Sequence, residues 1–224
     1  MKRGKLVVIE GLDGCGKSTQ LDLALGYLKE NGVNCRSVSF PNYDALSGKL
    51  VQQYLDGNIP CEDKNGAYAA SSIYAIDRYI SYRTDWKDFY DNGGIILAGR
   101  YTTSNAIYQL TKLPVSEHEK FLNWLCDFEY GKLGLPEPDL VIYLDMPIEI
   151  SQKLLDKRYL GDETKKDIHE RNIDFLRECR NSALYTANEC GWKVIKCFDG
   201  DYPLPIEDVY LKICDCLKVL TVYA

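Results

Sequence analysis

The sequence predicts an α/β fold built on a five-stranded parallel sheet with helices on both faces. Short apolar runs rich in β-branched residues alternate with longer segments of helical periodicity. A glycine-rich turn separates the first run from the first helix. The 224 residues, 46% hydrophobic and 27% charged, have the size and composition of an ordinary globular domain. We therefore expect one domain over residues 1–224, with ligands beyond the carboxyl ends of its strands.

Each expected strand is a short apolar run that ends at turn residues. The five runs cover residues 5–9, 35–40, 95–98, 140–144 and 192–197. Their continuous apolar character is typical of strands buried on both faces. Apolar residues with a period near 3.6 indicate the helices. These cover residues 18–31, 48–55, 67–90, 103–110, 117–130, 148–155, 168–190 and 206–219.

Composition argues against several classes of protein. A net charge of −6 is unfavourable for binding a nucleic-acid duplex, which requires broad basic surfaces. The first apolar run ends at Glu10, and no stretch approaches the ~18–20 apolar residues of a membrane helix. The nine cysteines include no Cys-x-x-Cys pair, which is typical of free thiols in a reducing compartment. We expect a cytoplasmic protein that binds neither membrane nor nucleic acid.

The turn after the first strand matches Gly-x-x-x-x-Gly-Lys-Ser/Thr, the phosphate loop (P-loop) pattern. Its glycines let backbone N–H groups surround a phosphate, and the following helix adds its dipole. Lys17 is expected to reach the terminal phosphates, and the Ser18 hydroxyl to ligate Mg²⁺. The predicted ligand is a nucleoside triphosphate. The residues expected to bind it are Gly11, Leu12, Asp13, Gly14, Cys15, Gly16, Lys17, Ser18 and Thr19.

Other features narrow the class of P-loop protein. The guanine-reading Asn-Lys-x-Asp motif of switch GTPases does not occur in the sequence, and an ATP-driven motor would usually be larger. A small kinase of a phosphorylated metabolite remains, and its second anionic substrate needs arginines of its own. Arg78 and Arg100 are the candidates.

Four blocks occur in a characteristic order: residues 10–20 around the P-loop, Phe-Pro-Asn-Tyr at 40–43, Tyr-Ala-Ile-Asp-Arg at 74–78, and Arg-Tyr-Thr-Thr-Ser-Asn-Ala-Ile-Tyr-Gln at 100–109. With these blocks the chain resembles the thymidylate kinase family, nucleoside monophosphate kinases that phosphorylate dTMP with ATP. The resemblance spans roughly residues 5–200. It implies ATP and Mg²⁺ as cofactors, a homodimer and a helical lid at about 156–168.

The resemblance also implies an acceptor site. Tyr74 would stack on the thymine ring, where the family usually has Phe. Arg78 would hydrogen-bond the base edge with Asn105 near it, and Tyr108 would close off the 2′ position of the sugar. The residues implied to bind substrate are Phe40, Pro41, Tyr43, Tyr74, Arg78, Arg100, Ser104, Asn105 and Tyr108.

Catalytic roles follow from the same resemblance. Arg100 would bridge the two phosphates, and Asp13 would approach the sugar 3′ side or the reacting phosphates, beside Lys17 of the P-loop. In this family Gly at the position of Gly14 usually goes with a basic residue in the lid, and Arg158 is the first candidate. Glu170, at the end of the lid, would help to position the metal or would simply begin a helix.

One position departs from the family pattern. Gly99 stands where the family has Asp before its Arg-Tyr pair, and that carboxylate ordinarily helps to hold the Mg²⁺ shell and to orient the arginine. Its loss puts the catalytic rate in doubt, and a glycine would also leave Arg100 less firmly placed. Two alternatives therefore stay open, a deoxynucleoside or other nucleoside monophosphate kinase and a catalytically weak nucleotide-binding homologue.

Overall fold

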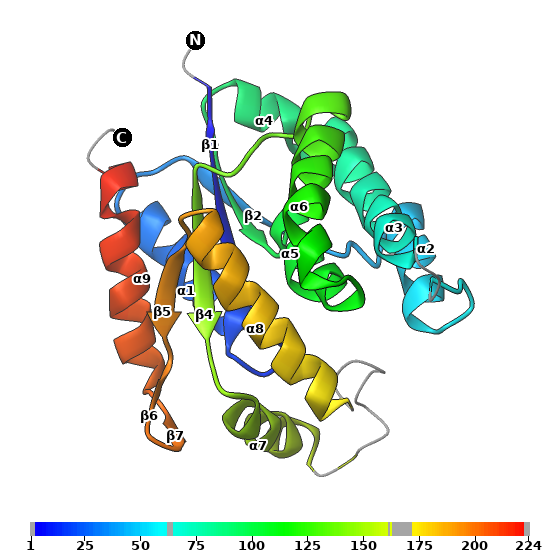
Figure 1. Cartoon of the computed structure of the whole chain (residues 1–224). Coiled ribbons are helices and arrows are strands. Elements are labelled where there is room, and N and C mark those ends of the chain that lie inside the picture. The colour runs from blue at the N-terminus through cyan, green and yellow to red at the C-terminus, as the bar shows by residue number, and fades with distance from the viewer. Residues whose placement is uncertain (1–2, 62–64, 161, 163–171, 222–224) are drawn as a thin grey trace.

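The computed structural model describes residues 3–61, 65–160, 162 and 172–221 (Figure 1). Its centre is a parallel sheet of five strands in the order β2-β3-β1-β4-β5, which confirms the predicted sheet. The strands are β1 (Lys5–Gly11), β2 (Cys35–Ser39), β3 (Ile95–Gly99), β4 (Leu140–Asp145) and β5 (Lys193–Lys196). Because all five run in one direction, their carboxyl ends meet at one edge, where the P-loop lies.

The helices connect these strands and lie on both faces of the sheet (Figure 1). The α-helices are α1 (Lys17–Glu30), α2 (Leu46–Leu55), α3 (Gly66–Ser81), α4 (Lys87–Asp91), α5 (Thr102–Gln109), α6 (His118–Cys126), α7 (Ile148–Tyr159), α8 (Ile173–Glu189) and α9 (Ile206–Thr221). Two π-helical segments are η1 (Tyr82–Trp86) and η4 (Asp127–Lys132), and two 3₁₀ turns are η2 (Leu110–Lys112) and η3 (Val115–Glu117).

Strand β1 divides its side chains between two hydrophobic clusters. Val7 and Ile9 pack with residues of α1 and α9, whereas Leu6 and Val8 pack with the aromatic side chains of η1 and α4. All four side chains have no exposed surface, as alternation on a doubly covered strand requires. This burial fixes the position of the P-loop, which follows β1 directly.

Several elements differ from the sequence prediction. The helix expected at 67–90 is interrupted by η1, and the one expected at 117–130 passes into η4, because hydrophobic periodicity does not distinguish a π turn from an α turn. Helix α7 continues to Tyr159, so residues 156–159 of the expected lid are helical. Residues 161 and 163–168 of that lid, and Glu170, lie outside the described residues. The β6 (Phe198–Asp199) and β7 (Tyr202–Pro203) hairpin was not predicted.

Two global expectations can be examined in the described part of the chain. None of its helices has the length and apolar character needed to cross a membrane. Each of the nine cysteines is a free thiol.

Candidate active site

The P-loop joins β1 to α1 and adopts a backbone that requires glycine. Gly14 and Gly16 have φ angles of 79° and 89°. A Cβ atom at Gly14 would lie 2.6 Å from the backbone oxygen of Ser151, so the loop packs against α7 without room for a side chain. Gly16 precedes α1, and no side chain caps the helix there. The first N–H groups of α1 therefore remain available to a phosphate.

A cavity of about 500 Å³ opens beside this loop. Gly14, Cys15, Gly16, Ser18 and Thr19 line one side of it. Gln20 of α1 also lines it, and its other walls come from the β4–α7 connection, α7, the β5–α9 connection and the start of α9: Met146, Leu154, Leu155, Arg158, Cys197, Pro203, Leu204, Ile206 and Val209. Arg158 lies near the end of α7 and is exposed, so the structure brings this predicted cation to the same cavity as the P-loop.

A second pocket, of about 260 Å³, lies on the other side of Asp13. It contains all but one of the predicted substrate-binding residues, brought together from α3, α5 and the turn after β2. Its lining is Asp13, Phe40, Pro41, Tyr43, Leu55, Tyr74, Arg100, Ser104, Asn105, Tyr108 and Gln109. The missing residue is Arg78.

Three polar side chains connect the P-loop to this second pocket. The guanidinium of Arg100 donates to the Asp13 carboxylate and, at 3.1 Å, to the Tyr108 hydroxyl, which itself donates to Asp13 Oδ2 at 3.2 Å. Burial alone would raise the pKa of Asp13, but Arg100 and Lys17 hold it below the ordinary value of 3.8. The carboxylate is thus ionised at neutral pH. Arg100 is thus held by Asp13 and Tyr108, and the expectation that Gly99 leaves it less firmly placed stays a prediction.

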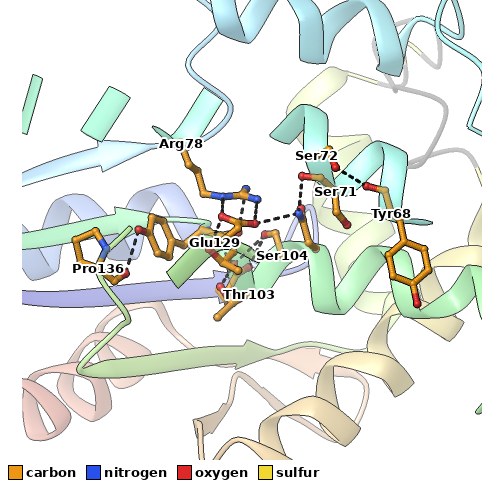
Figure 2. Close-up of polar contacts among 12 residues, drawn as sticks. Tyr68, Ser71, Ser72, Arg78, Thr103, Ser104, Glu129 and Pro136 are labelled. Atoms are coloured by element: carbon orange, nitrogen blue, oxygen red, sulfur yellow. Dashed lines mark hydrogen bonds and ion pairs between the residues drawn. The ribbon is translucent and has the colours of Figure 1, made fainter. Parts of the chain in front are cut away.

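Glu10 fixes the start of α5, although sequence reasoning assigned it no role. Its side chain has no exposed surface. Oε1 accepts from the Tyr101 backbone N–H at 3.2 Å, from Thr103 Oγ1 at 2.6 Å and from Ser104 Oγ at 2.8 Å (Figure 2). A carboxylate at a helix N-terminus satisfies N–H groups that lack partners within the helix. Glu10 thereby ties the helix that carries Ser104 to the strand that leads into the P-loop.

Arg78 is buried beneath the pocket and does not line it. Nε and Nη2 donate to Oε2 and Oε1 of Glu129, at 2.6 and 2.5 Å, in a bidentate pair with almost no exposed surface (Figure 2). Nη1 contacts the Tyr101 carbonyl oxygen at 3.4 Å. Sequence reasoning missed Glu129 because it approaches from η4, which is distant in sequence. The expected contact between Arg78 and a base edge stays a prediction.

The amide groups of two α5 residues also face the second pocket. Asn105 Nδ2 donates to the Ser71 carbonyl oxygen at 3.2 Å. Gln109 is 3% exposed, and its Oε1 is a buried oxygen with no hydrogen-bond partner among the described residues. A buried acceptor without a partner is costly unless a ligand or water supplies a donor. Gln109 lies one residue after Tyr108 in the 100–109 block, and this position was the only signal that could have identified it.

Gly99 ends β3 and is paired in register with Ile9 of β1. A Cβ atom there would lie 3.0 Å from Ser39 Oγ and 3.1 Å from Leu21 Cδ2. Leu21 belongs to α1, one turn beyond Lys17. The missing side chain would therefore point between β2 and α1, into a space that Ser39 and Leu21 have partly closed.

The arrangement thus consists of a phosphate-binding loop between two cavities. The larger contains the loop glycines and Arg158, and the smaller contains aromatic rings, amides and hydroxyls. Asp13 and Arg100 line the smaller pocket, and Asp13 and Lys17 belong to the loop whose glycines line the larger cavity. Two nucleotides placed in these cavities would meet with their phosphates at cationic side chains, the arrangement that phosphoryl transfer requires.

Comparison with known proteins agrees with this geometry. The family model for thymidylate kinase matches residues 9–200. The thymidylate kinase of Fervidobacterium nodosum is 29% identical over 97% of this chain and 98% of its own length. That of a Sulfurihydrogenibium species is 30% identical, over 96% and 97%. The Plasmodium falciparum enzyme is 29% identical over 79% of this chain and 80% of its own.

A solved structure of thymidylate kinase from Candida albicans has the same fold, with a TM-score of 0.71 and 23% identity over 97% of this chain and 92% of its own. The family match favours phosphorylation of dTMP over both alternatives raised by the sequence, the deoxynucleoside kinase and the catalytically weak homologue. The chain therefore belongs to the thymidylate kinase family, phosphotransferases that pass a phosphate group from ATP to dTMP.

Proposed function

We propose that the smaller pocket holds dTMP and the larger cavity holds ATP, with transfer between them across Lys17, Asp13 and Arg100. The observation that carries this assignment is the position of Arg100. It lines the smaller pocket and is hydrogen-bonded to Asp13 of the P-loop. A guanidinium at that point can contact an acceptor phosphate on one side and a transferred phosphoryl group on the other.

The lining of the smaller pocket suits a pyrimidine deoxynucleotide. Tyr74 and Phe40 supply flat apolar surface, and Asn105 and Gln109 supply amide side chains. In this proposal Tyr74 stacks on the thymine, Tyr108 blocks a 2′ hydroxyl, and Phe40, Pro41, Tyr43 and Ser104 complete the enclosure. Aromatic side chains and a few fixed polar groups are what small-molecule sites commonly use for affinity and for orientation, respectively.

At the donor site we propose that backbone N–H groups of residues 11–19 hold the ATP phosphates. Lys17 and Arg158 meet charge on the terminal phosphate, and Arg158 belongs to a lid at about 156–168. The residue that would hold Mg²⁺ is Ser18, whose hydroxyl offers one hard oxygen, and the ion would supply positive charge to the phosphates. Nucleotide-borne Mg²⁺ needs no larger protein cage.

Titration calorimetry with dTMP tests the acceptor assignment. Tyr74→Ala should weaken dTMP binding about 10- to 100-fold, because stacking on an aromatic ring is worth ~1–3 kcal/mol per base. Tyr185→Ala, which removes a tyrosine of α8 that does not line the pocket, is the matched control and should leave the dissociation constant unchanged. Equal affinity of wild type and Tyr74→Ala would remove dTMP from this pocket. Chelating Mg²⁺ should abolish transfer and leave dTMP binding intact.

We also propose a cytoplasmic homodimer that binds no nucleic acid. Leu46 and Leu50 of α2 and Ile76 and Ile80 of α3 are exposed apolar side chains on two helices that pack together. Clustered apolar exposure of this kind is typical of protein interfaces. Nine free thiols suit a reducing compartment, and the net charge of −6 is unfavourable for nucleic acid.

A further inference from the structure

We infer that Glu129 is a positioning residue that fixes the hydrogen-bonding polarity of the base pocket, so that the pocket selects a 4-keto pyrimidine over a 4-amino pyrimidine. The inference rests on the proposed acceptor site. Glu129 lies in η4, has no exposed surface and does not line the pocket. Its effect on the substrate must therefore pass through the side chains that it contacts.

Those contacts occupy both oxygens of the carboxylate. Oε1 accepts from Arg78 Nη2 at 2.5 Å and from Asn105 Nδ2 at a longer 3.5 Å. Oε2 accepts from Arg78 Nε at 2.6 Å and from Thr102 Oγ1 at 2.8 Å. Asn105 lines the pocket, Arg78 is buried on α3 one turn after Tyr74, which lines it, and Thr102 begins α5, the helix that carries Asn105.

The orientation of the Asn105 amide follows from this environment. An ionised carboxylate and a backbone carbonyl can only accept hydrogen bonds. Glu129 Oε1 and the Ser71 oxygen, both within 3.5 Å of Nδ2, therefore require the NH₂ end of Asn105 to face inward. The carbonyl Oδ1 is left as the atom that Asn105 can offer to the pocket, which its side chain lines. Gln109 Oε1, also without a donor, adds a second acceptor.

Hydrogen-bond acceptors along the pocket distinguish 4-keto pyrimidines from 4-amino pyrimidines. Thymine and uracil carry a proton on N3 and can donate to Oδ1, whereas cytosine has an unprotonated N3 that would face the oxygen with no proton between them. The ion pair adds a second constraint. Burial alone would lower the pKa of Arg78, but Glu129 raises it above the ordinary value and keeps the guanidinium charged and in one plane.

Replacing the carboxylate by an amide of the same shape weakens these constraints. In Glu129→Gln the charge is lost and one acceptor oxygen becomes NH₂, so only the Ser71 carbonyl oxygen still holds the Asn105 amide, and Arg78 loses its ionised partner. The ratio of kcat/KM for dTMP to kcat/KM for dCMP should fall about tenfold or more. The KM for ATP should stay the same, because no Glu129 contact reaches the P-loop. These measurements use the full-length protein.

A matched control separates positioning from stability. Leu217→Ala removes a fully buried side chain from the α1–α9 cluster and lowers the Tm without touching the pocket. Its dTMP/dCMP ratio should remain that of the wild type. If Glu129→Gln folds poorly, the double variant Arg78→Met with Glu129→Met avoids an unpaired buried charge and should also lose discrimination.

The outcomes are distinct. A dTMP/dCMP ratio that is unchanged in either folded Glu129 variant would overturn the role of Glu129 and leave the acceptor site intact. A Leu217→Ala enzyme that loses as much discrimination would show a general stability effect, and would overturn it too. A wild type that does not prefer dTMP over dCMP would contradict the acceptor assignment itself.

Discussion

Gly99→Asp tests whether the missing carboxylate limits the rate of this enzyme. We expect the wild type to bind both nucleotides normally but to turn over slowly, and Gly99→Asp to raise kcat about tenfold, equivalent to ~1.4 kcal/mol. The Cβ direction is toward Ser39 of β2 and Leu21 of α1, the helix that begins with Lys17, and an added carboxylate would extend from that position. There it can orient Arg100, the next residue, and serve the hydration shell of Mg²⁺.

The substitution also has a structural cost that can be estimated. A Cβ atom 3.0 Å from Ser39 Oγ and 3.1 Å from Leu21 Cδ2 is crowded, although the backbone of Gly99 does not lie in the left-handed region. Overpacking of this kind typically costs ~1–3 kcal/mol. For a chain of this length that lowers the Tm by roughly 2–10 °C. Gly99→Asn has the same shape and crowding but no charge, and is therefore the appropriate reference.

Single-turnover rates at saturating ATP and dTMP, together with melting curves, test whether a carboxylate at position 99 raises the rate of phosphoryl transfer. We expect similar melting temperatures for Gly99→Asp and Gly99→Asn but a kcat about tenfold higher for the Asp variant. Equal rates in these two variants would refute a role for the carboxylate. A wild type as fast as Gly99→Asp would show that Asp13 or another group already supplies what the family Asp provides.

The remaining predictions concern the P-loop, the acceptor and the surface. Lys17→Ala should lower kcat by about 100- to 1000-fold, the cost of removing a contact to developing charge, with an unchanged melting curve; normal kinetics would remove the ATP-site assignment. For acceptors, kcat/KM for dTMP should exceed that for UMP and dGMP by about tenfold or more, and equal rates with AMP or CMP would contradict the assigned acceptor site. Because Arg100 and Lys17 lower the folded-state pKa of Asp13, the stabilisation by its carboxylate is present above about pH 4 and is lost as the pH falls through that pKa. The difference in unfolding free energy between wild type and Asp13→Asn should therefore shrink at lower pH. A difference that does not change with pH would refute the ion pair. Ile76→Asp should yield a monomer in analytical ultracentrifugation while the control Leu211→Asp, on α9, stays dimeric; an unchanged dimer in both would move the interface elsewhere.

Local signals were sufficient for the sheet and the P-loop. The run from Lys5 to Ile9 is apolar at nearly every position, which is typical of a strand covered on both faces. The strand is followed by glycines because the backbone of the loop requires them. Lys17 and Ser18 follow the loop glycines at the fixed spacing of the P-loop pattern. These features depend on neighbours within about ten residues, so the sequence displays them directly.

Features that depend on contacts between distant segments were not accessible in the same way. Glu129 lies 51 residues from Arg78, and nothing in either segment indicates that their side chains meet. The expected contact of Arg78 with the base edge was inferred from its block alone, which gives no sign of the buried ion pair with Glu129. The turn between β6 and β7 contains Gly200 and Asp201, a local turn signal from which the hairpin could have been predicted.

The central claim is that the two cavities hold ATP and dTMP so that one phosphate group passes directly between them. Incubating the enzyme with γ-³²P-ATP and either dTMP or thymidine, and separating the products chromatographically, tests this claim most directly. We predict labelled dTDP from dTMP, no labelled product from thymidine, and labelled dTDP formed about 100- to 1000-fold more slowly with Lys17→Ala. Labelled dTMP from thymidine, or labelled inorganic phosphate released at the same rate with and without dTMP, would contradict it.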